Sequence, residues 1–129
     1  SLFTIDIRSP DINKLEKMES ELRDMAIDIC NKYKVKFQMD QIGGFDPVAF
    51  DKECLDNIRN SADKFGYSHK DIVSGAGHDA CWINTVAPSA MIMCPCVDGL
   101  SHNEAEEIKP QWAFSSTNVM LHAAIDSAK

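Results

Sequence analysis

A glycine-rich segment, Ser74–Ala80 (Ser-Gly-Ala-Gly-His-Asp-Ala), contains side chains and backbone groups that could take part in chemistry. Gly75 and Gly77 permit a tight turn or the close approach of a ligand to the backbone. His78 and Asp79 stand where a helix is expected to begin, and the free N–H groups of a helix N-terminus favour anions such as a carboxylate. The alternative is a tight loop in which Asp79 caps the helix and His78 is exposed. The spacing alone leaves both interpretations open.

A second candidate is His102, which follows an apolar run and a glycine turn in the segment Gly99–Glu106. Loops at the carboxyl ends of strands often carry the functional groups of open α/β sheets. Imidazole is a common metal ligand, and the Glu106 carboxylate could orient it. One histidine cannot form a zinc site, which needs three or four protein ligands. The alternative is a surface histidine beside an acidic helix start.

Arg8 is the third candidate, because it ends an alternating segment and lies on the polar face of that segment. Its planar guanidinium matches the two oxygens of a carboxylate. The alternative is a solvated charge at the end of a strand. The other histidines point to no site, since His69 lies in a polar loop and His122 lies late in a helical segment.

The five cysteines predict reduced thiols rather than a disulfide framework, because their number is odd. Cys94 and Cys96 are separated by one residue, whereas paired metal ligands usually need two to four intervening residues. We therefore expect ordinary, partly buried cysteines.

The elements that must position the candidates begin with a strand–helix–strand pattern in residues 1–42. Residues 2–8 and 35–39 alternate apolar and polar side chains, which is the period of a strand with one buried face. Between them, apolar residues recur every three or four positions from Ile12 to Tyr33, which predicts one long amphipathic helix. Ser9 is expected to cap this helix, with Pro10 in its first turn.

A break at Gly43-Gly44 divides the sequence into two predicted domains, residues 1–42 and 43–129. In the second, helices are expected over 48–65, over 81–86 and after Pro110, with Gly66 ending the first of them. Short strands are expected at 71–73 and 90–94. Strands that alternate with helices predict an α/β architecture.

Composition narrows the functional classes. The chain has 129 residues and a net charge of −7, which argues against a broad basic surface for nucleic acid. No apolar run approaches the roughly 20 residues that a membrane helix needs, and the start has no signal-peptide pattern. We therefore expect a cytoplasmic protein without nucleic-acid or membrane partners. The first residue is Ser1 and it opens a strand-like run, so we expect the sequence to enter a longer protein part-way.

Three segments taken together carry a family resemblance. They are Phe3–Asp11, Ser74–Ala80, and Met91–Pro95 followed by Gly99–Glu106. In this order and spacing they resemble the C-terminal part of the N-carbamoyl-L-amino acid hydrolases, the hydantoinase/carbamoylase amidases, which include allantoate amidohydrolases and β-ureidopropionases. The resemblance runs essentially from end to end of the chain.

The resemblance implies a larger enzyme than this chain. Family members have a dinuclear metal-dependent catalytic domain, interrupted by an α/β lid domain that also forms a homodimer contact. Residues 1–42 would be the second half of the lid, and residues 43–129 the closing part of the catalytic domain. The full-length chain would hold two divalent ions (zinc, manganese, cobalt or nickel) and hydrolyse the carbamoyl (ureido) C–N bond of a small ureido acid.

The resemblance also implies roles for individual residues. His102 matches the last metal ligand of a Ser-His-Asn-x-x-Glu motif, and Glu106 matches the closing glutamate that supports this ligand. Arg8 matches the lid arginine that clamps the substrate carboxylate. Gly77 and His78 match a pair that lines the substrate pocket. The catalytic base and the other metal ligands have no counterpart here, so we expect no catalytic residue in this chain and no activity from it alone.

Two other hypotheses stay open. The chain could be a non-catalytic dimerisation or scaffold module, which an exposed sheet edge would favour. It could also be a free-standing α/β domain that binds a small molecule, which would need a preformed pocket. One detail departs from the family pattern: position 84 is Asn, where a small apolar residue is expected.

Overall fold

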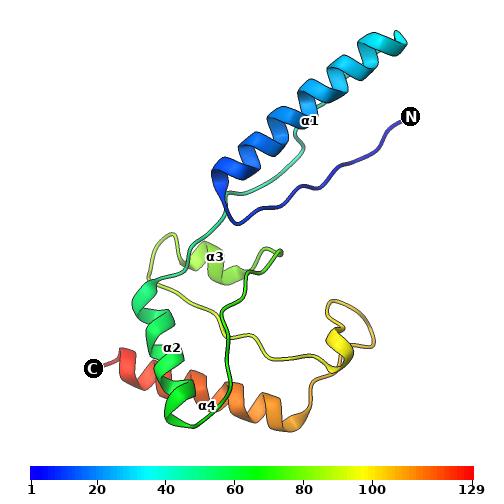
Figure 1. Ribbon diagram of the computed structural model, residues 1–129. Coiled ribbons are helices and arrows are strands. Elements are labelled where there is room, and N and C mark those ends of the chain that lie inside the picture. The colour runs from blue at the N-terminus through cyan, green and yellow to red at the C-terminus, as the bar shows by residue number, and fades with distance from the viewer. The chain divides into compact units, whose positions relative to one another are not determined.

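The computed structural model describes residues 1–129 as helices joined by long irregular segments (Figure 1). The helices are α1 (Ile12–Tyr33), α2 (Lys52–Lys64), α3 (Asp79–Ile83) and α4 (Pro110–Ser127), with one 3₁₀ turn, η1 (Val97–Gly99). The chain divides into two compact units. The first comprises Ser1–Val48 with Val73–Ala76, and the second comprises Ala49–Ile72 with Gly77–Lys129.

Helix α1 has the bounds expected from the spacing of its apolar residues, but its predicted cap was wrong. Asp11, rather than Ser9, is the N-cap, and its Oδ1 accepts hydrogen bonds from the backbone N–H groups of Asn13 (2.9 Å) and Lys14 (3.3 Å). Ser9 lies outside the helix, where its Oγ accepts from the Asp11 N–H at 3.1 Å. Asp11 takes the cap because its carboxylate is next to the free N–H groups of the first turn.

The predicted strands are not formed, so the strand–helix–strand detail and the α/β architecture of this chain are not confirmed. Residues 1–129 contain no strand, although the segment before α1 runs as an extended ribbon (Figure 1). Alternation specifies which face of a segment is apolar, but a strand also needs a neighbour about 4.8 Å away to complete its hydrogen bonds. The segments therefore leave their apolar side chains in solvent, with Phe3 76% and Val35 60% exposed.

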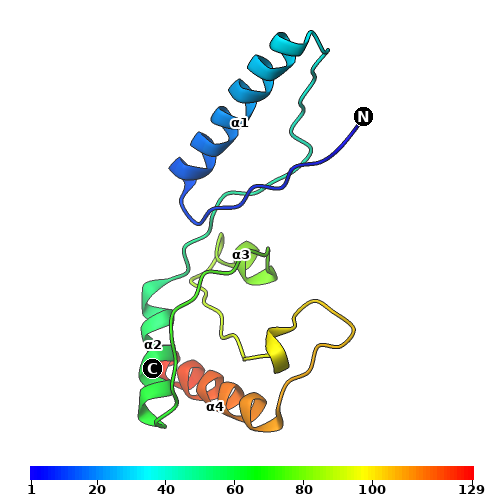
Figure 2. The same ribbon diagram turned by 45° about the vertical axis from the view of Figure 1, so that its right-hand side comes forward.

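The core of the second unit lies where α2 packs against α4 (Figure 2). Its buried residues are small: Ser61 and Ala62 on α2, and Val119 and Ala123 on α4. Small side chains on both helices let their backbones approach closely. Helix α2 ends as predicted, since Phe65 is the C-cap and Gly66 takes a left-handed φ of 68°.

Aromatic residues extend this core at the end of α2. The ring of Phe65 lies 4.6 Å from that of His122 and 6.0 Å from that of Tyr67, measured between centroids. The Tyr67 hydroxyl accepts a hydrogen bond from Asn118 Nδ2 at 3.4 Å. The turn after α2 is thereby fixed to α4.

Much apolar surface is uncovered. The accessible surface is 10540 Å², whereas a folded monomer of this length is expected to expose about 6,800 Å². No residue of the first unit is buried. Helix α4 is also apolar away from α2, where Phe114, Leu121 and Ile125 are exposed. No helix combines the length and apolarity needed to cross a membrane.

Candidate functional site

Arg8, the predicted carboxylate clamp, already contacts a carboxylate of its own chain. Its Nε donates to both oxygens of Asp6, at 3.0 and 3.1 Å, and its Nη2 donates to Asp6 Oδ2 at 2.5 Å. These hydrogen bonds, reinforced by the opposite charges, hold the pKa of Asp6 below its usual value and raise the pKa of Arg8. Both side chains are 61% exposed, so the pair lies in contact with solvent.

The remaining nitrogen of Arg8 reaches the glycine-rich segment. Nη1 donates to the backbone carbonyl oxygen of Gly75 at 2.5 Å, and both residues belong to the first unit. A Cβ atom at position 75 would lie 4.0 Å from Arg8 Cδ, which is an ordinary contact. The contact therefore uses the carbonyl group of residue 75 and does not depend on the absence of a side chain.

His78 lies at the start of α3, as the sequence predicts. It is the N-cap residue with an extended backbone (φ −137°, ψ 151°), and Asp79 is the first helical residue. Helix α3 has only five residues, so its dipole gives little support to the anion site considered above. Gly77 and His78 belong to the second unit, and their role in lining a pocket stays a prediction.

His102 lies in a tightly folded loop that follows η1. Its backbone takes a left-handed φ of 58°, and its N–H donates to Glu106 Oε2 at 2.7 Å. The other oxygen of Glu106 accepts from the thiol of Cys96, with Sγ and Oε1 3.5 Å apart. Partial burial, aided by this contact, raises the pKa of the Cys96 thiol. Glu106 thus links His102, within the loop, to Cys96, which immediately precedes η1.

The chain alone does not supply a metal site. Residues 1–129 contain no group of three or more His, Cys, Asp or Glu side chains arranged to hold a metal ion. A divalent transition metal such as zinc needs three or four protein ligands. His102 fits the role of a single nitrogen ligand, so the other ligands of any such site would have to come from outside this sequence.

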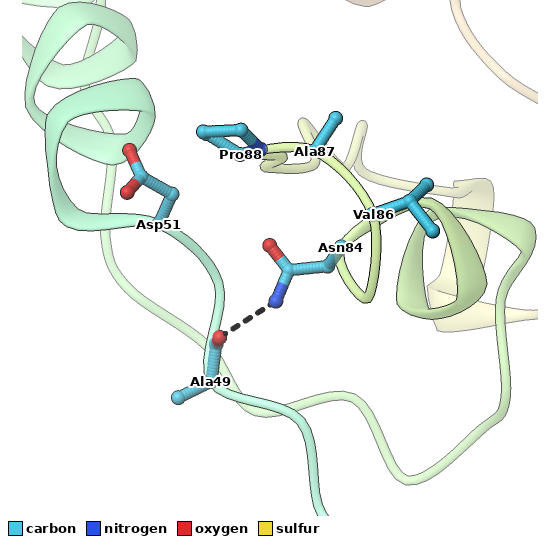
Figure 3. Close-up of a pocket in the computed structure, with 6 residues that line it drawn as sticks. All are labelled: Ala49, Asp51, Asn84, Val86, Ala87 and Pro88. Atoms are coloured by element: carbon cyan, nitrogen blue, oxygen red, sulfur yellow. Dashed lines mark hydrogen bonds between the residues drawn. The ribbon is translucent and has the colours of Figure 1, made fainter.

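An open hollow of about 380 Å³ lies beside the start of α2 (Figure 3), and its lining consists of Ala49, Asp51, Asn84, Val86, Ala87 and Pro88. Asn84 spans it: Nδ2 donates to the carbonyl of Ala49 at 3.0 Å, and Oδ1 accepts from the Ser89 N–H at 3.2 Å. None of the predicted site residues lines this hollow. It therefore gives little support to a free-standing binding domain.

Sequence reasoning missed two groups at Arg8. The alternation of residues 2–8 places Asp6 on the same polar face as Arg8, because residues i and i+2 of an extended segment lie on the same face. This Asp-x-Arg spacing was the signal that could have found it. The Gly75 carbonyl, 67 residues away, left no such signal.

Comparison with known proteins decides the family. Peptidase family M20/M25/M40 matches residues 2–126. The chain belongs to this family. The chain is 50% identical over 128 residues to an N-carbamoyl-L-amino-acid amidohydrolase of Rhizobium meliloti, covering 99% of the chain and 31% of that protein. It is 31% identical over 104 residues to an allantoate amidohydrolase of Escherichia coli, covering 81% of the chain and 25% of that protein.

A solved structure supports the same relationship. The chain is similar to a hydantoinase/carbamoylase family amidase from Burkholderia multivorans, with a TM-score of 0.87 and 46% identity over 92% of the chain and 29% of that structure. These findings confirm the resemblance inferred from the three sequence segments. The chain spans about a third of the length of the relatives that it matches.

Proposed function

We propose that residues 1–129 are part of a metal-dependent amidohydrolase that cleaves the carbamoyl (ureido) C–N bond of N-carbamoyl-amino acids or related ureido acids. The observation that carries this proposal is the 50% identity to an N-carbamoyl-L-amino-acid amidohydrolase along 99% of the chain. Two further relatives, an allantoate amidohydrolase of Escherichia coli and a ureidoglycolate hydrolase of Arabidopsis thaliana, have names that point to ureido substrates.

The residues divide into two groups in this proposal. Arg8 binds the substrate carboxylate, because its guanidinium is exposed and matches two oxygens, while Gly77 and His78 line the substrate pocket. His102 supplies one nitrogen ligand to a divalent metal, which is zinc, manganese, cobalt or nickel, and Glu106 supports it. Such an ion, when bound, activates water for attack on a carbonyl carbon.

The rest of the enzyme would complete what this chain lacks. We propose that residues 1–42 are half of a lid domain, whose strands at 2–8 and 35–39 pair with strands outside this sequence, and that residues 43–129 close the catalytic domain. The uncovered apolar surface supports this, because side chains such as Leu2 and Ile42 are exposed here. The chain alone would be inactive, and the complete protein would be a homodimer through its lid.

The experiment is an assay of the complete protein for ammonia release from N-carbamoyl-L-amino acids, allantoate and β-ureidopropionate, with metal analysis of the same sample. His102→Ala should lower both the bound metal and the activity, because one ligand is lost. His69→Ala is the matched control, since His69 pairs with Asp63 at 3.0 Å and carries no proposed role. Undiminished metal content and activity in His102→Ala would contradict the proposal.

One observation favours an alternative, a non-catalytic dimerisation or scaffold module: the first unit buries none of its residues. A partner surface would then be its main role. This alternative predicts that the complete protein associates but releases no ammonia from any of the three substrates. Sedimentation velocity and the same assay separate the two functions.

A further inference from the structure

The guanidinium of Arg8 is only partly used by the contacts that hold it. An arginine side chain has five N–H donors: one on Nε and two on each terminal nitrogen. Asp6 takes the Nε donor and one Nη2 donor, and the Gly75 carbonyl takes one Nη1 donor. One N–H on Nη1 and one on Nη2 remain.

The position of these two donors follows from the geometry of the planar group. Asp6 binds the side edge, which Nε and Nη2 form. The Nη2 hydrogen that remains therefore faces the end of the guanidinium, toward Nη1. A carboxylate oxygen can accept this hydrogen without displacing Asp6, because the side and end edges of the group are separate.

The Arg8–Asp6 contact contributes little to stability, since both side chains are 61% exposed and exposed ion pairs are weak. Its effect is to restrict the conformations that the Arg8 side chain can adopt. A free arginine loses much rotamer freedom when it binds a ligand, whereas a side chain that is already fixed loses less. Asp6 from the same segment and Gly75 from a distant one fix both sides of the group.

We propose that Asp6 and the Gly75 carbonyl are positioning groups, which fix the Arg8 guanidinium so that its end edge faces the substrate carboxylate. This inference rests on the proposed function, in which Arg8 binds that carboxylate. The opposite role for Asp6 is that of a competitor, an internal carboxylate that the substrate must displace. The two roles predict opposite changes in KM.

The test compares Asp6→Asn with Glu21→Gln in the complete protein. Asn has nearly the shape of Asp but loses the charge and one acceptor. Glu21 is a matched control, because it forms an exposed ion pair with Lys17 and its side chain is 62% exposed. The readouts are kcat and KM for an N-carbamoyl amino acid and for the same compound with its carboxylate converted to a carboxamide.

The positioning role predicts that Asp6→Asn raises KM for the carboxylate substrate about five- to tenfold, which is the usual net contribution of one hydrogen bond. The carboxamide, which lacks the group that Arg8 recognises, should show little change in KM, and kcat should change little for either compound. Glu21→Gln should match the unmodified protein. Thermal unfolding of all variants shows whether each is folded.

Two results would overturn the inference. A lowered KM in Asp6→Asn would make Asp6 a competitor, and an unchanged KM would give it no part in binding. Arg8→Gln separates the inference from the function on which it rests. If Arg8→Gln raises KM while Asp6→Asn does not, only the positioning role fails. If Arg8→Gln leaves KM unchanged, the role of Arg8 fails and the positioning role fails with it.

Discussion

The carboxylate of Glu106 binds the backbone of His102: Oε2 accepts from the His102 N–H at 2.7 Å. His102 holds a left-handed φ of 58°, which is uncommon for a residue with a β-carbon and needs support from its surroundings. The proposed metal ligand is therefore oriented through its main chain, and the glutamate that closes the Ser-His-Asn-x-x-Glu motif provides that support.

Removal of this carboxylate should loosen the loop. Glu106→Ala leaves the His102 N–H without its acceptor, so we expect its amide hydrogen to exchange about tenfold faster, in line with the loss of one charge-assisted hydrogen bond. Glu106→Gln keeps an acceptor oxygen and should show a smaller change. Glu104→Gln removes a charge from the same loop and is the control. Equal exchange rates in Glu106→Ala and the unmodified protein would contradict this role. Hydrogen exchange followed by NMR or mass spectrometry measures it.

The start of α1 depends on Asp11, which accepts from two backbone N–H groups. Asp11→Ala should cost about 1 kcal/mol of unfolding free energy, the usual effect of a lost N-cap. Asp11→Ser should restore most of it, because a serine hydroxyl also accepts. Asp28→Ala removes the same charge from the middle of the helix and should not destabilise. Denaturant unfolding followed by circular dichroism tests this, and equal losses at both positions would refute the cap.

Arg59 ties the segment after α2 to the helix, and this contact predicts a pH dependence. Its guanidinium donates to Asp71 at 2.8 and 3.1 Å and to Asp56 at 2.7 Å. The hydrogen bonds with Arg59 hold the pKa of Asp71 below its ordinary value of 3.8. Because the folded pKa is the lower one, the contact stabilises the protein above about pH 3.8, and this stabilisation is lost as the pH falls through the folded pKa.

Arg59→Gln should return the pKa of Asp71 toward its ordinary value. The pKa of Asp56 should stay low, because its hydrogen bond with the Lys52 side chain is the largest cause of the lowered pKa. NMR titration of the two carboxyl carbons distinguishes them. Parallel shifts of both groups would count against the separate partners described here.

Asn84 should hold together the two sides of the hollow beside α2, because it bonds both Ala49 and Ser89 (Figure 3). Asn84→Ala removes two hydrogen bonds, so we expect the free energy of unfolding to fall by about 1–2 kcal/mol and the Ser89 amide hydrogen to exchange faster. Asn84→Asp keeps the acceptor for Ser89 but not the donor to Ala49, and should retain Ser89 protection. If the Ser89 amide exchanges at the same rate in Asn84→Ala, the hydrogen bond from Ser89 to Asn84 has no stabilising effect.

The sequence predicted where helices form, but it did not predict which segments pair with one another. The three- and four-residue spacing of apolar side chains fixed the bounds of α1, and Pro110 marked the start of α4. The predicted strands are not formed in this chain, because pairing depends on a second segment, which alternation does not specify. Prediction of the Asp11 cap failed for a local reason, since three neighbouring residues at 9–11 could each begin a helix.

In the candidate site, too, local features were easier to predict than contacts between distant residues. Residue type and motif singled out Arg8 and His102 as candidates, because their chemistry is carried by single side chains, and their roles stay predictions. Their supporting contacts were not fully predictable. Glu106 is four residues from His102 and within reach of a local pattern, but Gly75 meets Arg8 across 67 residues. No spacing rule connects positions so far apart.

The first unit is discontinuous, and this limits how the gene can be cut. Val73–Ala76 belongs with Ser1–Val48, so the chain leaves the first unit, returns for four residues and leaves again. Expression of residues 1–48 alone would omit the carbonyl that holds Arg8, and expression of residues 49–129 alone would carry that carbonyl without its arginine. To express the first unit intact, Ser1–Val48 and Val73–Ala76 would have to be joined by a designed linker, or overlapping pieces of the chain would have to be co-expressed. During synthesis, likewise, Arg8 can gain its second partner only after residue 75 has left the ribosome.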